Sequence, residues 1–178
     1  NEHLDRVATA LTRLRSDDEL VKVVLARALV LNAESPVTAT QLVHRLAGND
    51  AHGNGFAVDL SPAGGAWQGR YLVGASPEVL ICRRGDRVTA HPLAGSAPRH
   101  ADPDIDRATG EELSASAKNL AEHAHVVANL RASLEPLCTD LDIPDRPQLT
   151  TTGQLWHLGT PVSGRLRDPS VTALDLAV

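Results

Sequence analysis

The segment Val21–Leu31, which reads VKVVLARALVL, constrains the fold more than any other part of the sequence. Its Val, Leu and Ala residues occupy both odd and even positions, a pattern typical of a strand that is covered on both faces. The segment is too short for a membrane span, which needs ~20 consecutive apolar residues, and no longer apolar run occurs elsewhere in the sequence. We therefore predict a strand between the layers of a soluble domain, with no membrane partner.

Lys22 interrupts this apolar segment. Its neighbours at period two are Val24 and Ala26, so its aliphatic stem is predicted to point toward an apolar face where small residues leave room. Loss of solvent on such a face would make the Lys22 amine a usable general base. The alternative is a lysine at a strand end whose stem extends to water.

Other segments predict a mixture of helices and strands. Apolar residues at helical spacing predict helices over 2–15, 38–47 and 110–135, and Pro169-Ser170 is typical of the start of another. Paired strands are predicted at 56–60 with 68–75 and at 79–83 with 87–91, and 149–166 reads as extended chain. Because these elements do not alternate strictly, we expect an α+β fold with mainly antiparallel strands and helices outside.

Composition excludes several classes of function. The formal net charge is −5, the 17 Lys and Arg residues are spread along the chain, and only four aromatic side chains of the Phe, Tyr and Trp types are present. This argues against binding of nucleic acid through its phosphates or its bases. Cys82 and Cys138 are too few and too far apart for a disulfide framework or a thiolate metal site, which fits a reduced, cytoplasmic setting.

Glu78 is a candidate general acid. It follows Gly74-Ala75-Ser76-Pro77, a tight turn that leaves a predicted strand. A carboxylate on such a turn can be held rigidly, as proton transfer requires. The alternative is an ordinary glutamate of a turn that faces solvent.

The segment Pro92–Arg99, which reads PLAGSAPR, is a candidate site for a carboxylate. It places Gly95 and the hydroxyl of Ser96 in a predicted turn just past a strand, and the backbone N–H groups of such a turn can cradle an anion. Many ordinary loops share this composition.

Glu122 is a candidate ligand for a hard divalent ion, since such ions prefer carboxylate oxygen. The alternative is a weak surface pair with Lys118, four residues earlier. Zinc is disfavoured because the histidines of this helix lack i,i+4 spacing. Asp102, Asp104 and Asp106 lack the Gly and Glu of a calcium loop and instead favour the N-terminal end of the following helix.

Five motifs occur together and in order: KVVLAR (22–27), VGASPEVLICRRG (73–85), PLAGSAPR (92–99), SAK with EH (116–123) and LWHLGTPVSG (155–164). In this order and spacing the chain resembles isochorismate synthases of the siderophore type, from about Asp18 onward. The resemblance implies an αββα chorismate-binding fold, chorismate as the substrate and Mg²⁺ as the cofactor.

The resemblance also implies a role for each candidate residue. Lys22 matches the lysine that activates water for attack at ring carbon C2, and Glu78 matches the acid that protonates the departing C4 hydroxyl. Glu122 matches one of the glutamates that hold magnesium. Substrate contacts are implied for Ala94, Gly95, Ser96 and His157. The implied reaction is the reversible conversion of chorismate to isochorismate, an isomerisation of the hydroxymutase type.

Two positions distinguish this chain from related enzymes of the same family. Members that use ammonia tend to carry Gln where Lys22 stands, and aminodeoxychorismate synthases carry a nucleophilic Lys where Ala94 stands. The pair Lys22 and Ala94 therefore indicates water as the nucleophile. Salicylate synthases share the Lys, so a salicylate synthase, in which isochorismate then loses pyruvate, stays an alternative. A non-catalytic homologue is another.

Two features depart from the family pattern. The usual Lys-Asp-Arg-x-Glu-His appears here as Lys118-Asn119-Leu120-Ala121-Glu122-His123. Family members also continue well past Val178, where a second metal-binding glutamate and a Gly-rich turn are implied. We therefore expect residues 1–178 to be an incomplete chorismate-binding domain, ending within a helix and inactive by itself. Isochorismate feeds siderophores, salicylate and menaquinone, and Pro92–Arg99 favours the first.

Overall fold

The computed structural model describes residues 2–16, 19–20, 22–48 and 54–177. It divides into two compact units, Asn1–Val37 and Thr38–Val178, and each is described by itself. The α+β class predicted from the sequence is confirmed, because helices combine with purely antiparallel sheets. Among the residues that the structure describes, no helix is both long enough and apolar enough to cross a membrane.

The first unit contains helix α1 (Glu2–Ser16), as predicted. Acidic Glu2 and Asp5 lie in its first turn and basic Arg13 and Arg15 in its last, an arrangement that stabilises a helix through its dipole.

The strand predicted for Val21–Leu31 is wrong over residues 22–31. Val21 itself lies outside the described residues. Residues 22–31 form neither helix nor strand, and the side chains of Val30 and Leu31 are 89% and 87% exposed. The reason is that a strand exists only through hydrogen bonds to a neighbour. All paired strands among the described residues come from residue 55 onward, so this apolar segment has no partner strand there.

The second unit begins with helix α2 (Ala39–Ala47), packed on a hairpin of β1 (Gly55–Asp59) and β2 (Tyr71–Ala75). A reciprocal capping box between Thr38 and Gln41 starts the helix, and the hairpin pairs Gly55 with Ala75. Two short 3₁₀ turns, Ser61–Ala63 and Gly65–Trp67, connect the strands. The predictions for this region are confirmed.

A four-stranded antiparallel sheet follows, in the order β3 (Cys82–Arg84), β4 (Arg87–Ala90), β9 (Val162–Leu166) and β6 (Cys138–Asp142). The predicted β3–β4 pair is confirmed, with a shorter first strand. One hydrophobic core cluster lies on this sheet, and its buried members include Val88, Leu134 and Val162. Burial of such side chains contributes roughly 1.5–3 kcal/mol each.

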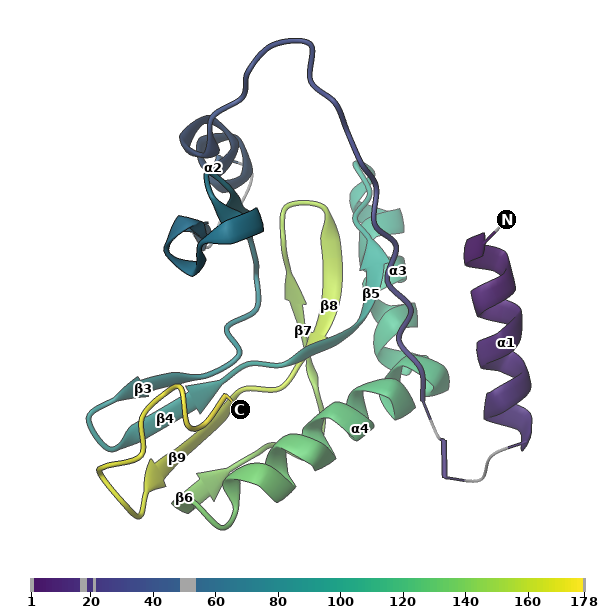
Figure 1. Cartoon of the computed structure of the whole chain (residues 1–178). Helices are drawn as coiled ribbons and strands as arrows, with labels where there is room; N and C mark the ends of the chain where they lie inside the picture. Colours follow the sequence, from purple (N-terminus) through teal and green to yellow (C-terminus); the bar gives the residue numbers. More distant parts are fainter. Residues whose placement is uncertain (1, 17–18, 21, 49–53, 178) are drawn as a thin grey trace. The chain divides into compact units, whose positions relative to one another are not determined.

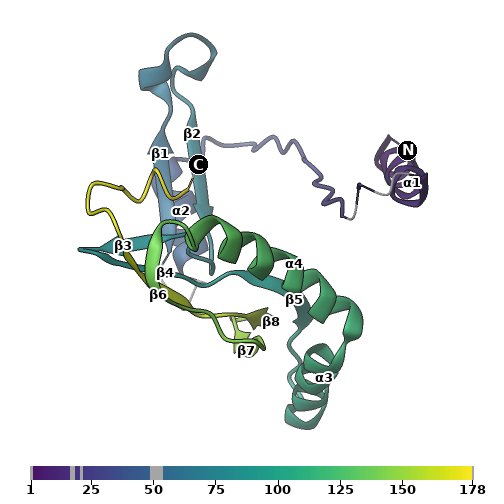
Figure 2. The ribbon, with the colours of Figure 1, turned by 90° about the horizontal axis from the view of Figure 1, so that it is seen from below.

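The remaining sheet carries most of the predicted site. Its three strands run in the order β5 (Leu93–Pro98), β8 (Leu155–Gly159) and β7 (Gln148–Thr151). Figure 1 shows β5 continuing directly from β4, so one segment of chain joins the two sheets. Helices α3 (Pro103–Ala115) and α4 (Ala117–Leu134) pack on this sheet, and Figure 2 shows α4 beside β5.

The single helix predicted over 110–135 is wrong, because the chain forms two helices that meet at Ser116. This residue is extended, with φ −68° and ψ 109°, and its hydroxyl accepts a hydrogen bond from the Asn119 N–H. A serine that caps a new helix ends the previous one even though the apolar spacing continues. Asp102 caps α3 in the same way, as expected for the N-terminal end of that helix.

The helix predicted from Pro169-Ser170 is also wrong, since residues 169–177 contain turns at 169–170 and 173–177 and no helix. The carboxylate of Asp175 accepts hydrogen bonds from the backbone and hydroxyl of Thr172, at 2.7 Å each. This closes a single turn locally. Strands β5 and β6 were not predicted. For β5 the reason is that Leu93–Pro98 consists largely of Ala, Gly, Ser and Pro, residue types that are rarely diagnostic of strands.

Candidate active site

The seven predicted site residues fall in both units. Lys22 lies in the first unit, half-buried, in a segment without helix or strand. The other six lie in the second unit: Glu78 between β2 and β3, Ala94, Gly95 and Ser96 on β5, Glu122 on α4, and His157 on β8.

Glu78 is held between its own turn and the start of β5. Its carboxylate Oε1 accepts a hydrogen bond from the backbone N–H of Leu93 at 3.0 Å. The hydroxyl of Ser76 accepts the Glu78 N–H at 3.2 Å. The turn thus positions an exposed carboxylate next to the strand that carries three of the other predicted residues.

The turn predicted for Gly95 and Ser96 is wrong, because both residues lie in strand β5. The strand is irregular at this point: its register against β8 shifts between Leu93 and Ser96. Gly95 has φ +88°, a conformation that L-residues rarely adopt, and a Cβ there would lie 3.1 Å from Cβ of Asn119. Glycine therefore permits both the bulge and its close contact with α4.

His157 lies opposite Ser96 on the neighbouring strand, and both of its ring nitrogens have polar neighbours. Nδ1 lies 2.8 Å from Oγ of Ser96, and Nε2 lies 3.2 Å from Oγ1 of Thr152. Burial lowers the pKa of His157, and the charge of Glu78 opposes that change. The ring is accordingly neutral near neutral pH and lies within the electrostatic reach of Glu78.

A cavity of about 350 Å³ adjoins this histidine. Its lining includes Pro77, Thr152 and His157, together with apolar atoms of Leu46 and Leu155. The structure therefore brings Glu78, Ser96 and His157 into one region of the second unit.

His123 is a residue of this region that was not predicted as part of the site. Its side chain is 1% exposed, and its ring lies between the carbonyl of Ala94 at 3.1 Å and the hydroxyl of Thr160 at 2.7 Å. Burial lowers its pKa. The sequence could have identified His123 through its place directly after Glu122 in the EH motif. Nothing in the sequence pointed to Thr160.

Glu122 is half-buried on α4, and its carboxylate oxygens are the donor type that Mg²⁺ prefers. Among the described residues, no three His, Cys, Asp or Glu side chains gather into a group that could hold a metal ion. Among the described residues, Glu122 therefore fits magnesium only as one protein ligand. Mg²⁺ often keeps several waters and takes one or two carboxylates, so a single glutamate is compatible with such a site.

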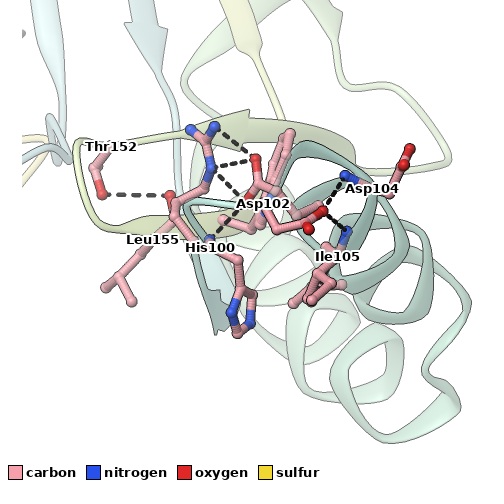
Figure 3. A network of polar contacts seen from close by, with 10 residues as sticks. His100, Asp102, Asp104, Ile105, Thr152 and Leu155 are labelled. Carbon is pink, nitrogen blue, oxygen red and sulfur yellow. Dashed lines mark hydrogen bonds and ion pairs between the residues drawn. The ribbon is translucent and has the colours of Figure 1, made fainter.

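A second network, also not predicted, ties the far end of β5 to α3. The carboxylate of Asp106 accepts hydrogen bonds from the Arg99 guanidinium, the His100 N–H and the Trp156 indole, at 2.7 to 3.0 Å. The Arg99 guanidinium also lies 4.6 Å from the Trp156 ring centroid. The hydrogen bonds from Arg99, against the effect of desolvation, hold the pKa of Asp106 well below its usual range. Figure 3 shows this network with the adjoining Asp102 cap.

Comparisons with known proteins show which family the chain resembles. The family model for chorismate binding enzymes matches residues 1–177. A Mycobacterium tuberculosis protein, provisionally named isochorismate synthase MenF, is 50% identical over 99% of this chain and 48% of its own length. Isochorismate synthase DhbC of Bacillus subtilis is 43% identical over 99% of this chain and 44% of its own length.

A solved structure from Bacillus anthracis, provisionally assigned as a 2,3-dihydroxybenzoate-specific isochorismate synthase, superposes with a TM-score of 0.71 at 38% identity. The match covers 81% of this chain and 38% of that one. The chain thus spans about half the length of the curated relatives it matches. The match over nearly every residue shows that the chain belongs to the family of chorismate-binding enzymes.

Proposed function

We propose that the protein to which these residues belong is an isochorismate synthase that converts chorismate to isochorismate reversibly. The observation that carries the proposal is the 43% identity to isochorismate synthase DhbC across 99% of this chain. The presence of Lys22 and Ala94 supports water rather than an amine as the nucleophile.

The proposed reaction needs one base and one acid. The Lys22 amine takes a proton from water while the water oxygen forms a bond to ring carbon C2. The two ring double bonds shift by one position, and the C4–O bond breaks as Glu78 donates a proton to the departing oxygen. One water enters and one leaves, so chorismate is isomerised without net hydrolysis. Proton transfer by such groups typically contributes ~10²–10⁴-fold to the rate.

The surroundings of Glu78 support its role as the acid. The Leu93 N–H bond fixes its carboxylate at the start of β5, within electrostatic reach of His157. Ala94, Gly95, Ser96 and His157 are the proposed substrate contacts. Gly95 has a left-handed backbone conformation, a feature of the backbone arrangements that can present N–H groups to an anion.

Glu122 is the proposed protein ligand for magnesium. When bound, the ion would neutralise the charge of the substrate carboxylate. The donor chemistry of Glu122 supports this assignment, and its position on α4, the helix packed on β5, supports a place near the substrate contacts.

The proposal is tested by incubating the complete protein with chorismate and Mg²⁺ and separating the products by chromatography. We expect isochorismate as the product, and loss of the activity when the metal is removed by a chelator. Salicylate and pyruvate as the products would instead identify a salicylate synthase. Chorismate binding without any product would identify a non-catalytic homologue. Either result would overturn the proposal.

A further inference from the structure

His123 connects α4 to two separate parts of the neighbouring sheet. Its ring Nδ1 lies 3.1 Å from the carbonyl oxygen of Ala94 on β5, and its Nε2 lies 2.7 Å from the hydroxyl of Thr160, directly after β8. The side chain is 1% exposed, so water does not compete for these bonds. A buried imidazole with two partners is expensive to disturb, because any loss leaves a buried polar atom unsatisfied.

The partners determine which nitrogen carries the proton. A carbonyl oxygen only accepts hydrogen bonds, so Nδ1 must be the N–H donor to Ala94. In the neutral ring Nε2 then accepts from the Thr160 hydroxyl, which can rotate to donate.

The Ala94 carbonyl lies where β5 departs from a regular ladder. The pairing of β5 with β8 shifts between Leu93 and Ser96, and such a shift leaves the intervening residues without regular partners. Gly95 adopts φ +88° at the same point. The helix approaches closely here, because a Cβ on Gly95 would lie 3.1 Å from Asn119, one helical turn before His123.

We propose that His123 is a positioning residue that fixes the bulge of β5 against α4 through the Nδ1–H bond to Ala94. The bond gives the Ala94 carbonyl a partner on α4 at the point where the register between β5 and β8 shifts. It sets the backbone of Gly95 and Ser96 relative to Glu122, which directly precedes His123 on the helix. This role rests on the proposed function, in which Gly95 and Ser96 contact chorismate and Glu122 binds magnesium.

A pair of amide substitutions separates this role from simple packing. Asparagine places its NH₂ group near the position of Nδ1 and can keep the bond to Ala94. Glutamine reaches the position of Nε2 and can keep only the contact with Thr160. If His123 served only to fill space, the larger glutamine would be the milder change, whereas positioning predicts that asparagine is milder.

The experiment uses the complete protein with His123→Asn, His123→Gln and, as a matched control, His125→Gln on the exposed side of the same helix. We expect His123→Gln to raise the KM for chorismate about tenfold, equivalent to roughly 1.4 kcal/mol. His123→Asn should recover most of that loss, and His125→Gln should leave the KM unchanged.

A spectroscopic measurement tests the role without any activity. In the ¹⁵N-labelled protein the His123 ring should show a protonated Nδ1 and an unprotonated Nε2. The amide signals of Gly95 and Ser96 should shift strongly in His123→Gln and little in His123→Asn. If the wild-type protein formed no isochorismate, the proposed function would fail while these signals still tested the positioning role. An Nε2–H tautomer, or smaller shifts in His123→Gln than in His123→Asn, would overturn it.

Discussion

At the scale of single residues, the proposed chemistry divides between the amine of Lys22 and the carboxylate of Glu78. A base that acts mainly in the transition state affects turnover more than substrate binding. Lys22→Gln in the complete protein should therefore lower kcat by ~10²–10⁴-fold and leave the dissociation constant for chorismate nearly unchanged. Stopped-assay kinetics and a binding titration check the two parts.

The matched control for Lys22 is Arg27→Gln, which removes a positive charge from the same segment at an exposed position. It should retain nearly full turnover. Isochorismate formation at a near-normal rate by Lys22→Gln would rule out the assignment of Lys22 as the base.

Glu122 and Lys118 lie four residues apart on α4. The role of Glu122 could therefore be a surface ion pair with Lys118 instead of metal binding. If Glu122 binds magnesium, Glu122→Gln should raise the Mg²⁺ concentration for half-maximal activity by more than about tenfold, or about 1.4 kcal/mol. Lys118→Ala should change it by no more than about twofold, because exposed i,i+4 pairs contribute only ~0.2–0.5 kcal/mol. Equal, small effects in a magnesium titration would favour the surface pair.

At the scale of elements, Asp106 on α3 holds the segment that follows β5 through the Arg99 and His100 bonds, and holds β8 through the Trp156 bond. The bonds hold its pKa below the ordinary value of 3.8. A carboxyl with a depressed folded pKa stabilises the fold above its unfolded pKa, and this contribution is lost as the pH falls toward the folded pKa. Asp106→Asn should lower the melting temperature at neutral pH, and the difference from wild type should shrink as the pH drops below 3.8.

Asp104→Asn is the matched control, because Asp104 lies on the same helix with a side chain that is 83% exposed. Thermal melts of both variants across a pH series provide the measurement. Equal effects of the two substitutions, or a difference for Asp106→Asn that is constant with pH, would contradict a stabilising role for this network.

The sequence predicted best the elements that are stabilised by residues close to one another in the chain. Helix α1 and the hairpin around Gly64 and Gly65 follow from apolar spacing and turn residues, which act locally. The break at Ser116 was missed because its cap competes with a spacing that runs through both helices. The strand predicted at 21–31 was wrong over 22–31, because apolar residues at both parities indicate burial but the described residues offer them no partner strand.

The same distinction applies to the site. Glu78, Ser96 and His157 were predicted from motifs, and the structure brings them into one region. Their catalytic and binding roles stay predictions. Two contacts of the site were not predictable, because they join residues far apart in the sequence. Ser96 and His157 are 61 positions apart, and Ala94 and His123 are 29 positions apart. Spatial proximity of this kind depends on the register of β5 against β8 and on the packing of α4.

At the scale of the whole molecule, many large apolar side chains are exposed among the described residues, including Val24, Val30 and Leu31 at 79% or more. Large exposed apolar patches usually mark a binding surface or cause aggregation. We expect residues 1–178 expressed alone to bind a hydrophobic dye, to melt without a sharp transition and to form no isochorismate. A soluble monomer with a cooperative melt and measurable turnover would contradict this expectation.

The origin of the new hydroxyl oxygen tests the central claim most directly. The complete protein is incubated with chorismate in H₂¹⁸O, and isochorismate is collected early and examined by mass spectrometry. Attack by water activated by Lys22 predicts one ¹⁸O atom in the hydroxyl at C2 of the initial product, and labelled product from Lys22→Gln only at a rate lowered by ~10²–10⁴-fold. Isochorismate without the label would show that the hydroxyl migrates within the substrate, and would contradict the proposed mechanism.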